Sequence, residues 1–186
     1  MKGKGLILGA AIVIVAMSTV LAGCGSDTKQ ANSLVREAGD LAGTAQDRMT
    51  EIGKLLQQAS DQLTDGNIEE EKASLDQAQV LIDQTIADLE SAKSKVDEAA
   101  SLDISDAFRQ YLEAKSKVME GGVNMMNASR ELTALLQADP GLERPETLEQ
   151  VNALQEQVLE LNQQVQAAEA EAQRIADENK DDIGTD

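Results

Sequence analysis

Apolar residues in this chain recur at alternating intervals of four and three over most of its length. Near residues 28–65 the pattern holds without a miss, which is the a/d pattern of a heptad repeat. Such a repeat gives a helix one apolar face, which packs on a neighbouring helix. The chain is therefore restricted to long helices packed side by side. The positions in this first segment are Ala31, Val35, Ala38, Ala42, Ala45, Met49, Ile52, Leu56, Ala59 and Leu63.

Helix-breaking residues fall in three places and divide the chain into segments of similar length. The breaks are a glycine-containing turn at 64–67, a polar interruption at 101–105, and a loop at 138–147 that holds both prolines. They predict helices near residues 28–65, 68–101, 105–138 and 146–180, followed by an acidic tail over 181–186.

The first two breaks contain residues typical of helix ends. Gly66 suits the left-handed position that ends a helix, and Asn67 with Glu70 predicts the cap of the next helix. In the second break the predicted cap is Asp103 or Ser105.

Four segments of about 35 residues predict an all-α fold with helices about 52 Å long. Equal lengths and short connections favour antiparallel neighbours, so we expect an up-down four-helix bundle with coiled-coil-like heptads over residues 28–180. A heptad repeat predicts that one helix packs on another, but it predicts less well how many helices share one core. A second architecture therefore stays open, in which two long hairpins complete their core in a homo-oligomer.

The third segment is the least regular. Lys115, Gly122 and Ser129 occupy positions of its apolar seam, and Gly121-Gly122 lies at its middle. Each glycine costs about 1 kcal/mol relative to alanine inside a helix. The pair therefore predicts a kink, a local break, or a place where a neighbouring helix comes very close.

The composition excludes several classes of site. The chain has no His and one Cys, which excludes His- or Cys-based zinc sites, Ser-His-Asp and Cys-His nucleophiles and a disulfide within one chain. A net charge of -18 argues against nucleic acid as a partner, because that affinity comes from Lys and Arg contacting phosphates.

The remaining candidate ligands have simpler interpretations. Met119, Met125 and Met126 could bind copper(I), but they also fill positions where a core needs apolar side chains. The acidic clusters lack the spacing of a calcium loop, and the run Glu69-Glu70-Glu71 suits the first turn of a solvated helix. We therefore expect no catalytic residue, cofactor or metal site, and a protein that is not an enzyme.

Residues 1–23 have the layout of an export signal. Lys2 and Lys4 give a basic start, Leu6 to Ala22 is a run of 17 uncharged residues, and small residues precede Cys24. The run is slightly short for a membrane span, which needs about 20 apolar residues. Cleavage of this segment is the expectation.

The junction Leu21-Ala22-Gly23-Cys24 resembles the lipobox of bacterial lipoprotein precursors. The resemblance implies cleavage between Gly23 and Cys24, and attachment of acyl chains such as palmitate to the new N-terminus at Cys24. Residues 24–27 would then be a short tether. The protein would be extracytoplasmic and anchored by lipid, in the outer leaflet of the cell membrane or in an outer membrane where the source has one.

Together these features predict a non-catalytic lipoprotein of the cell envelope that acts as a helical spacer, scaffold or protein-binding accessory. In an up-down bundle the first and third connections lie at the end far from the anchor, about 50 Å out. The surface expected to meet an envelope protein is therefore the proline-bearing loop, at Leu142, Glu143 and Arg144.

The alternative is an extracytoplasmic ligand-binding or sensory four-helix domain. It would hold a small molecule in a cavity near Gly121-Gly122 or near Phe108 and Tyr111. Polar side chains expected to line that cavity are Lys115, Asn124 and Ser129.

Overall fold

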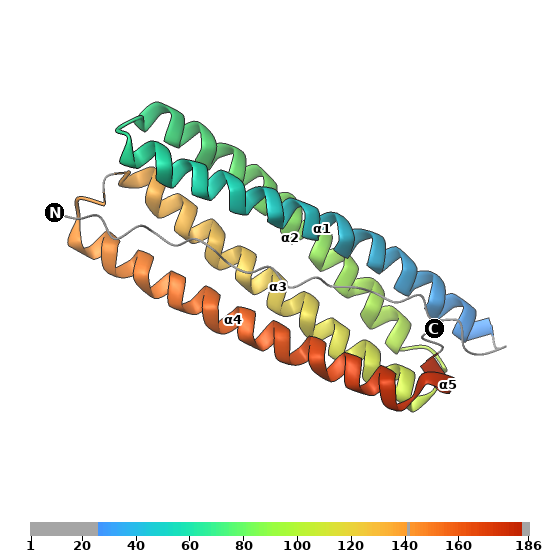
Figure 1. Cartoon of the computed structure of the whole chain (residues 1–186). Helices are drawn as coiled ribbons and strands as arrows, with labels where there is room; N and C mark the ends of the chain where they lie inside the picture. The colour runs from blue at the N-terminus through green and yellow to red at the C-terminus, as the bar shows by residue number, and fades with distance from the viewer. Residues whose placement is uncertain (1–25, 141, 184–186) are drawn as a thin grey trace.

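The computed structural model describes residues 26–140 and 142–183, which are helical apart from short connections (Figure 1). The expected signal segment, the Gly23–Cys24 junction and Cys24 itself lie outside the described residues. The helices are α1 (Ser26–Thr64), α2 (Ile68–Ala100), α3 (Asp106–Ala138), α4 (Pro145–Glu178) and the short α5 (Lys180–Ile183).

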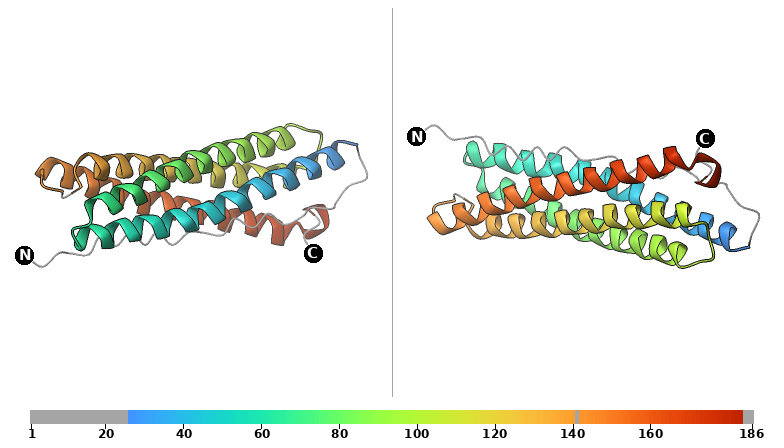
Figure 2. Two further views of the ribbon diagram at one scale, coloured as in Figure 1. Left: turned by 90° about the horizontal axis from the view of Figure 1, so that it is seen from above. Right: turned by 90° about the horizontal axis from the view of Figure 1, so that it is seen from below.

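The four long helices alternate in direction and pack in chain order (Figures 1 and 2). α1 packs along α2, α2 along α3, and α3 along α4, which confirms the predicted all-α, up-down four-helix bundle. Short connections enforce this arrangement, because a two- to eight-residue link returns the chain beside the helix it has just left. Among the described helices, α1 and α4 do not pack along one another.

The connections show which helix-end predictions hold. Gly66 has a φ of 79°, the left-handed conformation expected of it. Ser105 is confirmed as the cap of α3, since its side-chain oxygen accepts a hydrogen bond from the Phe108 amide at 3.2 Å. Asn67 takes the predicted N-cap position immediately before α2, and its carbonyl oxygen accepts from the Glu71 amide at 3.0 Å. Its side chain makes no capping bond, and its backbone, at φ -88° and ψ 67°, lacks the extended conformation typical of a cap.

The core follows the heptad seams. The seam positions of α1 from Ala31 to Ala59 are buried, and the seams of the other helices bury mainly Leu, Ile, Val, Met and Ala. Ile183 of α5 is fully buried, so the segment predicted as an acidic tail begins within a packed helix. Within residues 26–140 and 142–183, no helix is both long and apolar enough to cross a membrane.

Candidate functional site

The loop between α3 and α4 is organised by one buried carboxylate. Asp139 accepts hydrogen bonds from the backbone amides of Glu143 at 3.2 Å and Arg144 at 3.1 Å, and from Arg144 Nε at 3.2 Å. Burial alone would raise the pKa of Asp139, but these bonds and one from the Thr147 hydroxyl outweigh it and leave the pKa below its usual range. The charged form of Asp139 therefore holds the backbone of Glu143 and Arg144 close to the end of α3.

The structure brings the three predicted surface residues into this loop but does not expose all of them. Glu143 and Arg144 are exposed, whereas Leu142 is half-buried and packs against the core. Leu142 has a φ of 47°, and its amide donates to the Asp139 carbonyl oxygen at 2.9 Å. The surface that the loop presents is thus the pair Glu143 and Arg144, with Leu142 as its internal support.

The loop at 139–144 shares its end of the bundle with the turn between α1 and α2 (Figure 1). We call this the far end. The opposite end holds the start of α1 at Ser26, the turn between α2 and α3, and α5. A helix of 33 residues such as α3 separates the two ends by about 50 Å. The prediction that the first and third connections lie together is confirmed.

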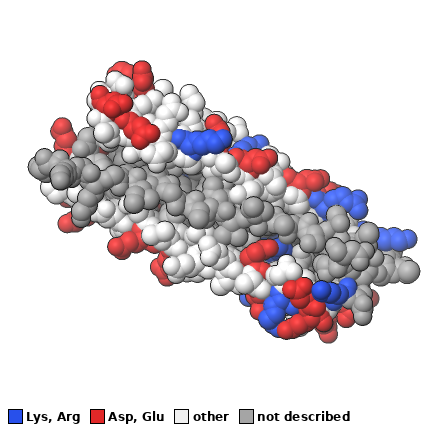
Figure 3. All heavy atoms as spheres, in the orientation of Figure 1, with Lys and Arg blue, Asp and Glu red and all other residues white. Residues whose placement is uncertain are grey.

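Acidic side chains gather at the far end, over the α1–α2 turn at the upper left of Figure 3. Asp65, Glu69 and Glu70 are exposed there, as expected for a solvated helix start. Glu71 is different: it is 2% exposed and occupies a position of the α2 seam, so the expectation that the whole run is solvated is wrong for this residue. Burial raises the pKa of Glu71, and Lys72 opposes the shift.

A buried ion pair joins the N-terminal half of α3 to α4. Lys115 Nζ lies 2.6 Å from Glu169 Oε1, with the lysine side chain 3% and the glutamate 20% exposed. The ammonium also lies 5.6 Å from the ring centre of Tyr111, within range of a cation–π contact. Sequence reasoning identified Lys115 as a break in the seam but missed Glu169. A search for an acid at the matching height of the antiparallel neighbour would have found it.

The glycine pair of α3 is a place of close approach, and α3 continues through it without a break. A Cβ added to Gly121 would lie 2.5 Å from Val165 Cγ2 of α4, and one added to Gly122 would lie 3.1 Å from Leu89 Cδ1 of α2. Neighbouring side chains therefore fill the first of the two positions where a cavity was expected.

The polar side chains expected to line that cavity are placed otherwise. Lys115 is paired with Glu169, Asn124 is exposed, and the Ser129 hydroxyl donates to the Met125 carbonyl oxygen at 3.0 Å. Met119, Met125 and Met126 are buried in the core, as the packing interpretation predicted. In the described part of the chain, no group of three or more acidic side chains is placed to hold a metal ion.

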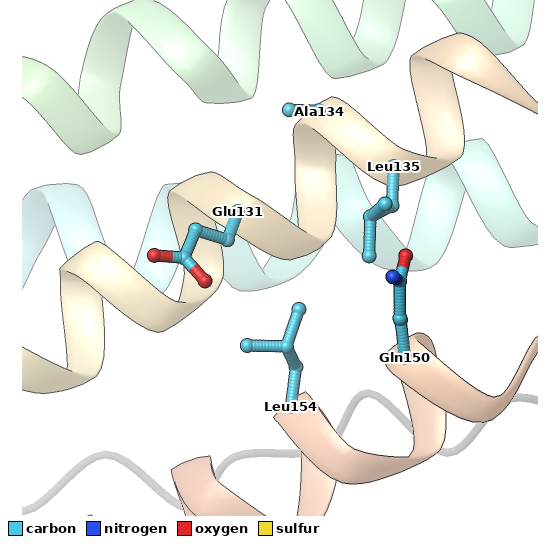
Figure 4. A pocket seen from close by; sticks show the side chains of 5 residues that line it. All are labelled: Glu131, Ala134, Leu135, Gln150 and Leu154. Carbon is cyan, nitrogen blue, oxygen red and sulfur yellow. The ribbon is translucent and has the colours of Figure 1, made fainter. Parts of the chain in front are cut away.

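A hollow of about 500 Å³ lies on the outer surface between α3 and α4, near the far end (Figure 4). It is wide open to solvent, and its polar groups are one carboxylate and one amide. A drug-sized ligand needs a pocket that encloses most of its surface, so this hollow offers weak recognition at best. The lining residues are Glu131, Ala134, Leu135, Gln150 and Leu154.

The titration of Tyr111 tests the burial of the region around Lys115 and Glu169. Its absorbance can be followed separately, because it is the only Tyr and the chain has no Trp. Burial, with a smaller contribution from the Glu169 charge, raises the pKa of Tyr111 to about 12. Absorbance at the phenolate band should therefore change little up to about pH 11 in the folded protein, but titrate near pH 10 in urea. Because the folded pKa is the higher one, the associated stability is present below pH 10 and is lost as the pH rises towards 12. A folded-state titration near pH 10 would show that the ring is accessible.

Comparisons of the chain with protein-family models, with curated proteins and with solved structures gave no match.

Proposed function

We propose that the protein is a non-catalytic lipoprotein of the cell envelope, which uses its helical bundle to hold a protein-binding surface away from the membrane. The signal layout of residues 1–23 and the lipobox ending at Cys24 support the anchor. The observation that carries the proposal is the topology, because α1 begins two residues after Cys24 at one end and the α3–α4 loop lies at the other. An anchor at Cys24 would therefore leave the far end as the part of the bundle most distant from the bilayer.

The construction of the far-end loop supports its role as a recognition surface. Binding costs less when the surface is already ordered, since little conformational entropy is lost. Asp139 holds the backbone of Glu143 and Arg144, and Leu142 packs beneath them. The exposed pair carries both signs of charge on a fixed backbone, which suits a polar protein partner.

The buried ion pair has a structural role in this proposal. Lys115 and Glu169 neutralise one another inside the α3–α4 interface, and the outer hollow lies around different residues. The ligand-binding alternative loses one of its two expected locations, since Val165 and Leu89 fill the space beside the two glycines.

The anchor is tested by replacing Cys24 with Ala. The variant should incorporate no radiolabelled palmitate and should accumulate as the unprocessed precursor, because the thiol that accepts the lipid is absent. Ser26→Ala, a similarly small change two residues away, should label and mature like the wild type. Equal labelling of Cys24→Ala and the wild type would refute the lipid anchor.

The partner surface is tested with a photo-crosslinking amino acid at Glu143 and, as a matched control, at Asp103. Both are exposed acids in connections, but they lie at opposite ends of the bundle. In intact cells we expect a discrete crosslinked product from position 143 and none from position 103. The reverse result would place the partner surface at the anchored end and contradict this part of the proposal.

A further inference from the structure

Glu71 is a buried acid at the start of an otherwise uncharged row on α2. The row repeats every seven residues, a spacing that keeps side chains on nearly one line along a helix. Glu71 is 2% exposed, and each of the other members is fully buried. These other members are Ala78, Thr85, Ala92 and Ala99. A carboxyl group therefore occupies a position that the rest of the row fills with small, uncharged side chains.

The row lies between α1 and the centre of the bundle. Ser74, three residues after Glu71, donates a hydrogen bond from its hydroxyl to Gln62 Oε1 of α1 at 2.8 Å. Leu89, four residues after another member of the row, lies against Gly122 of α3. Steps of three and four residues turn about 60° and about 40° around a helix in opposite directions. The row therefore faces the seam between α1 and α2, beside the core.

The bond between Ser74 and Gln62 also gives the height of Glu71 in the bundle. α1 and α2 run in opposite directions, so three residues back along α2 match about three residues forward along α1 (Figure 1). That step reaches Asp65, in the turn that follows α1. Glu71 thus lies just inside the closed end of the α1–α2 hairpin. We call residues 61–71 the hairpin end.

One oxygen of this carboxyl group has no partner. Glu71 Oε2 is shielded from solvent and accepts no hydrogen bond from the described residues. A charged carboxylate in such a place loses its hydration without replacement, which is costly, whereas a neutral acid loses much less. Burial accordingly raises the pKa of Glu71. The closed hairpin end therefore favours the form of Glu71 that carries a proton.

Few cations are placed to balance a charge on Glu71. Lys72, the next residue, opposes the rise of its pKa, but burial outweighs it. Arg144, another cation at this end, is paired with Asp139. The other charged residues described at this level are acids, namely Glu69 and Glu70 of α2, Asp61 and Asp65 of α1 and its turn, and Glu143 of the α3–α4 loop. Ionised Glu71 would therefore face one free cation and several acids.

The packing of α1 weakens at the hairpin end. Its seam is buried as far as Ala59, but Leu63, the next seam position, is only half-buried. Three backbone hydrogen bonds, of 2.8 to 3.1 Å, join the turn at 65–67 to the last turn of α1. Helix ends open at low free energy compared with a core. Separation of this last turn from α2 would give Glu71 access to water without unfolding the bundle.

We propose that Glu71 makes the hairpin end sensitive to pH: the acid that carries a proton stabilises the closed form, and the charged carboxylate favours opening of the last turn of α1. The stabilisation is fully present below about pH 4.5, the ordinary pKa of a Glu, and is lost as the pH rises through the raised pKa of Glu71. An effect on a partner at Glu143 and Arg144, which share this end, rests on the proposed function. The pH response of the hairpin end does not.

Hydrogen exchange of the full-length protein, followed by mass spectrometry at pH 3.5 and pH 7, tests the proposal. The readout is the protection of residues 61–71, corrected for the intrinsic effect of pH, with residues 97–105 at the opposite end as the internal reference. At pH 7, Glu71→Gln should be more protected there than the wild type, by about tenfold for each unit by which the pKa is raised. At pH 3.5 the two proteins should be nearly equal, because the side chain at position 71 is then mostly neutral in both.

Glu70→Gln is the matched control, because it removes one charge from the exposed neighbouring residue. It should exchange like the wild type at both pH values. Glu71→Met, which is neutral and apolar, should like Glu71→Gln gain more protection over the wild type at pH 7 than at pH 3.5. Circular dichroism verifies the helical fold of each variant.

Three results would overturn the inference. They are equal exchange of the wild type and the Glu71 variants at pH 7, a gain in Glu71→Gln that is as large at pH 3.5, and an equal gain in Glu70→Gln. The first would show that burial of the charge costs nothing, and the others that its ionisation is not the cause. None of these measurements depends on palmitate labelling at Cys24 or on crosslinking at Glu143, so failure of this inference is distinguishable from failure of the proposed function.

Discussion

Replacing Glu169 by Gln should lower the free energy of unfolding by about 3 kcal/mol, because it removes the carboxylate partner of a buried ammonium. Lys115 is 3% exposed and lies in the α3–α4 interface, where water cannot readily replace the lost charge. Urea unfolding followed by circular dichroism measures the change. The same variant should lower the pKa of Tyr111, since the Glu169 charge contributes to raising it, although burial, the larger cause, remains.

Two further variants distinguish the effect of the lost charge on stability from the effect of the changed packing. Lys115→Met should cost less, because Glu169 keeps one-fifth of its side chain exposed and can turn towards solvent. The double variant Lys115→Met with Glu169→Leu should be close to the wild type in stability, as buried ion pairs often are when both partners become apolar. A Glu169→Gln variant as stable as the wild type would show that the pair contributes nothing to the interface.

Gly121→Ala should destabilise the protein by about 2 kcal/mol, although alanine is the better helix former. The new methyl would lie 2.5 Å from Val165 Cγ2, and a β-branched side chain has little freedom to move away. α3 and α4 must therefore separate locally, and the midpoint of urea unfolding reports the cost.

Gly43→Ala on α1 is the control for helix propensity. A Cβ at Gly43 meets nothing within 4 Å, so this variant should be more stable by up to about 1 kcal/mol. Val165→Ala combined with Gly121→Ala should recover part of the loss by providing room for the methyl. Equal stabilisation by Gly121→Ala and Gly43→Ala would contradict the close approach at the centre of α3.

The sequence predicted the helices well because their signals are local. Periodic apolar residues, a glycine at 66 and two prolines near 138–147 set each helix within a few residues of where the structure has it. The up-down order follows from short connections. The absence of α1–α4 packing could not be predicted, since a heptad specifies an apolar face but not the number of neighbours that cover it.

The parts of the site that were missed depend on pairs of residues far apart in the chain. Glu169 is one of several acids on α4, and only its height opposite Lys115 distinguishes it. Asp139 organises the far-end loop through bonds to residues four and five positions later, a geometry that composition does not reveal. Glu71 looked solvated because it follows two exposed acids, yet its position in the α2 seam decides its burial.

The packing of each long helix on its neighbours in sequence has a consequence for how the chain folds. Contacts between adjacent helices close short loops, so little chain entropy is lost before the first contacts form. The α1–α2 hairpin already contains the ion pairs of Arg48 with Asp88 and of Glu37 with Lys95. It can therefore form before α3 is available, and α3 and α4 can then add in order. A chain that emerges N-terminus first from a membrane pore would fold in the direction of its emergence, without waiting for its last helix.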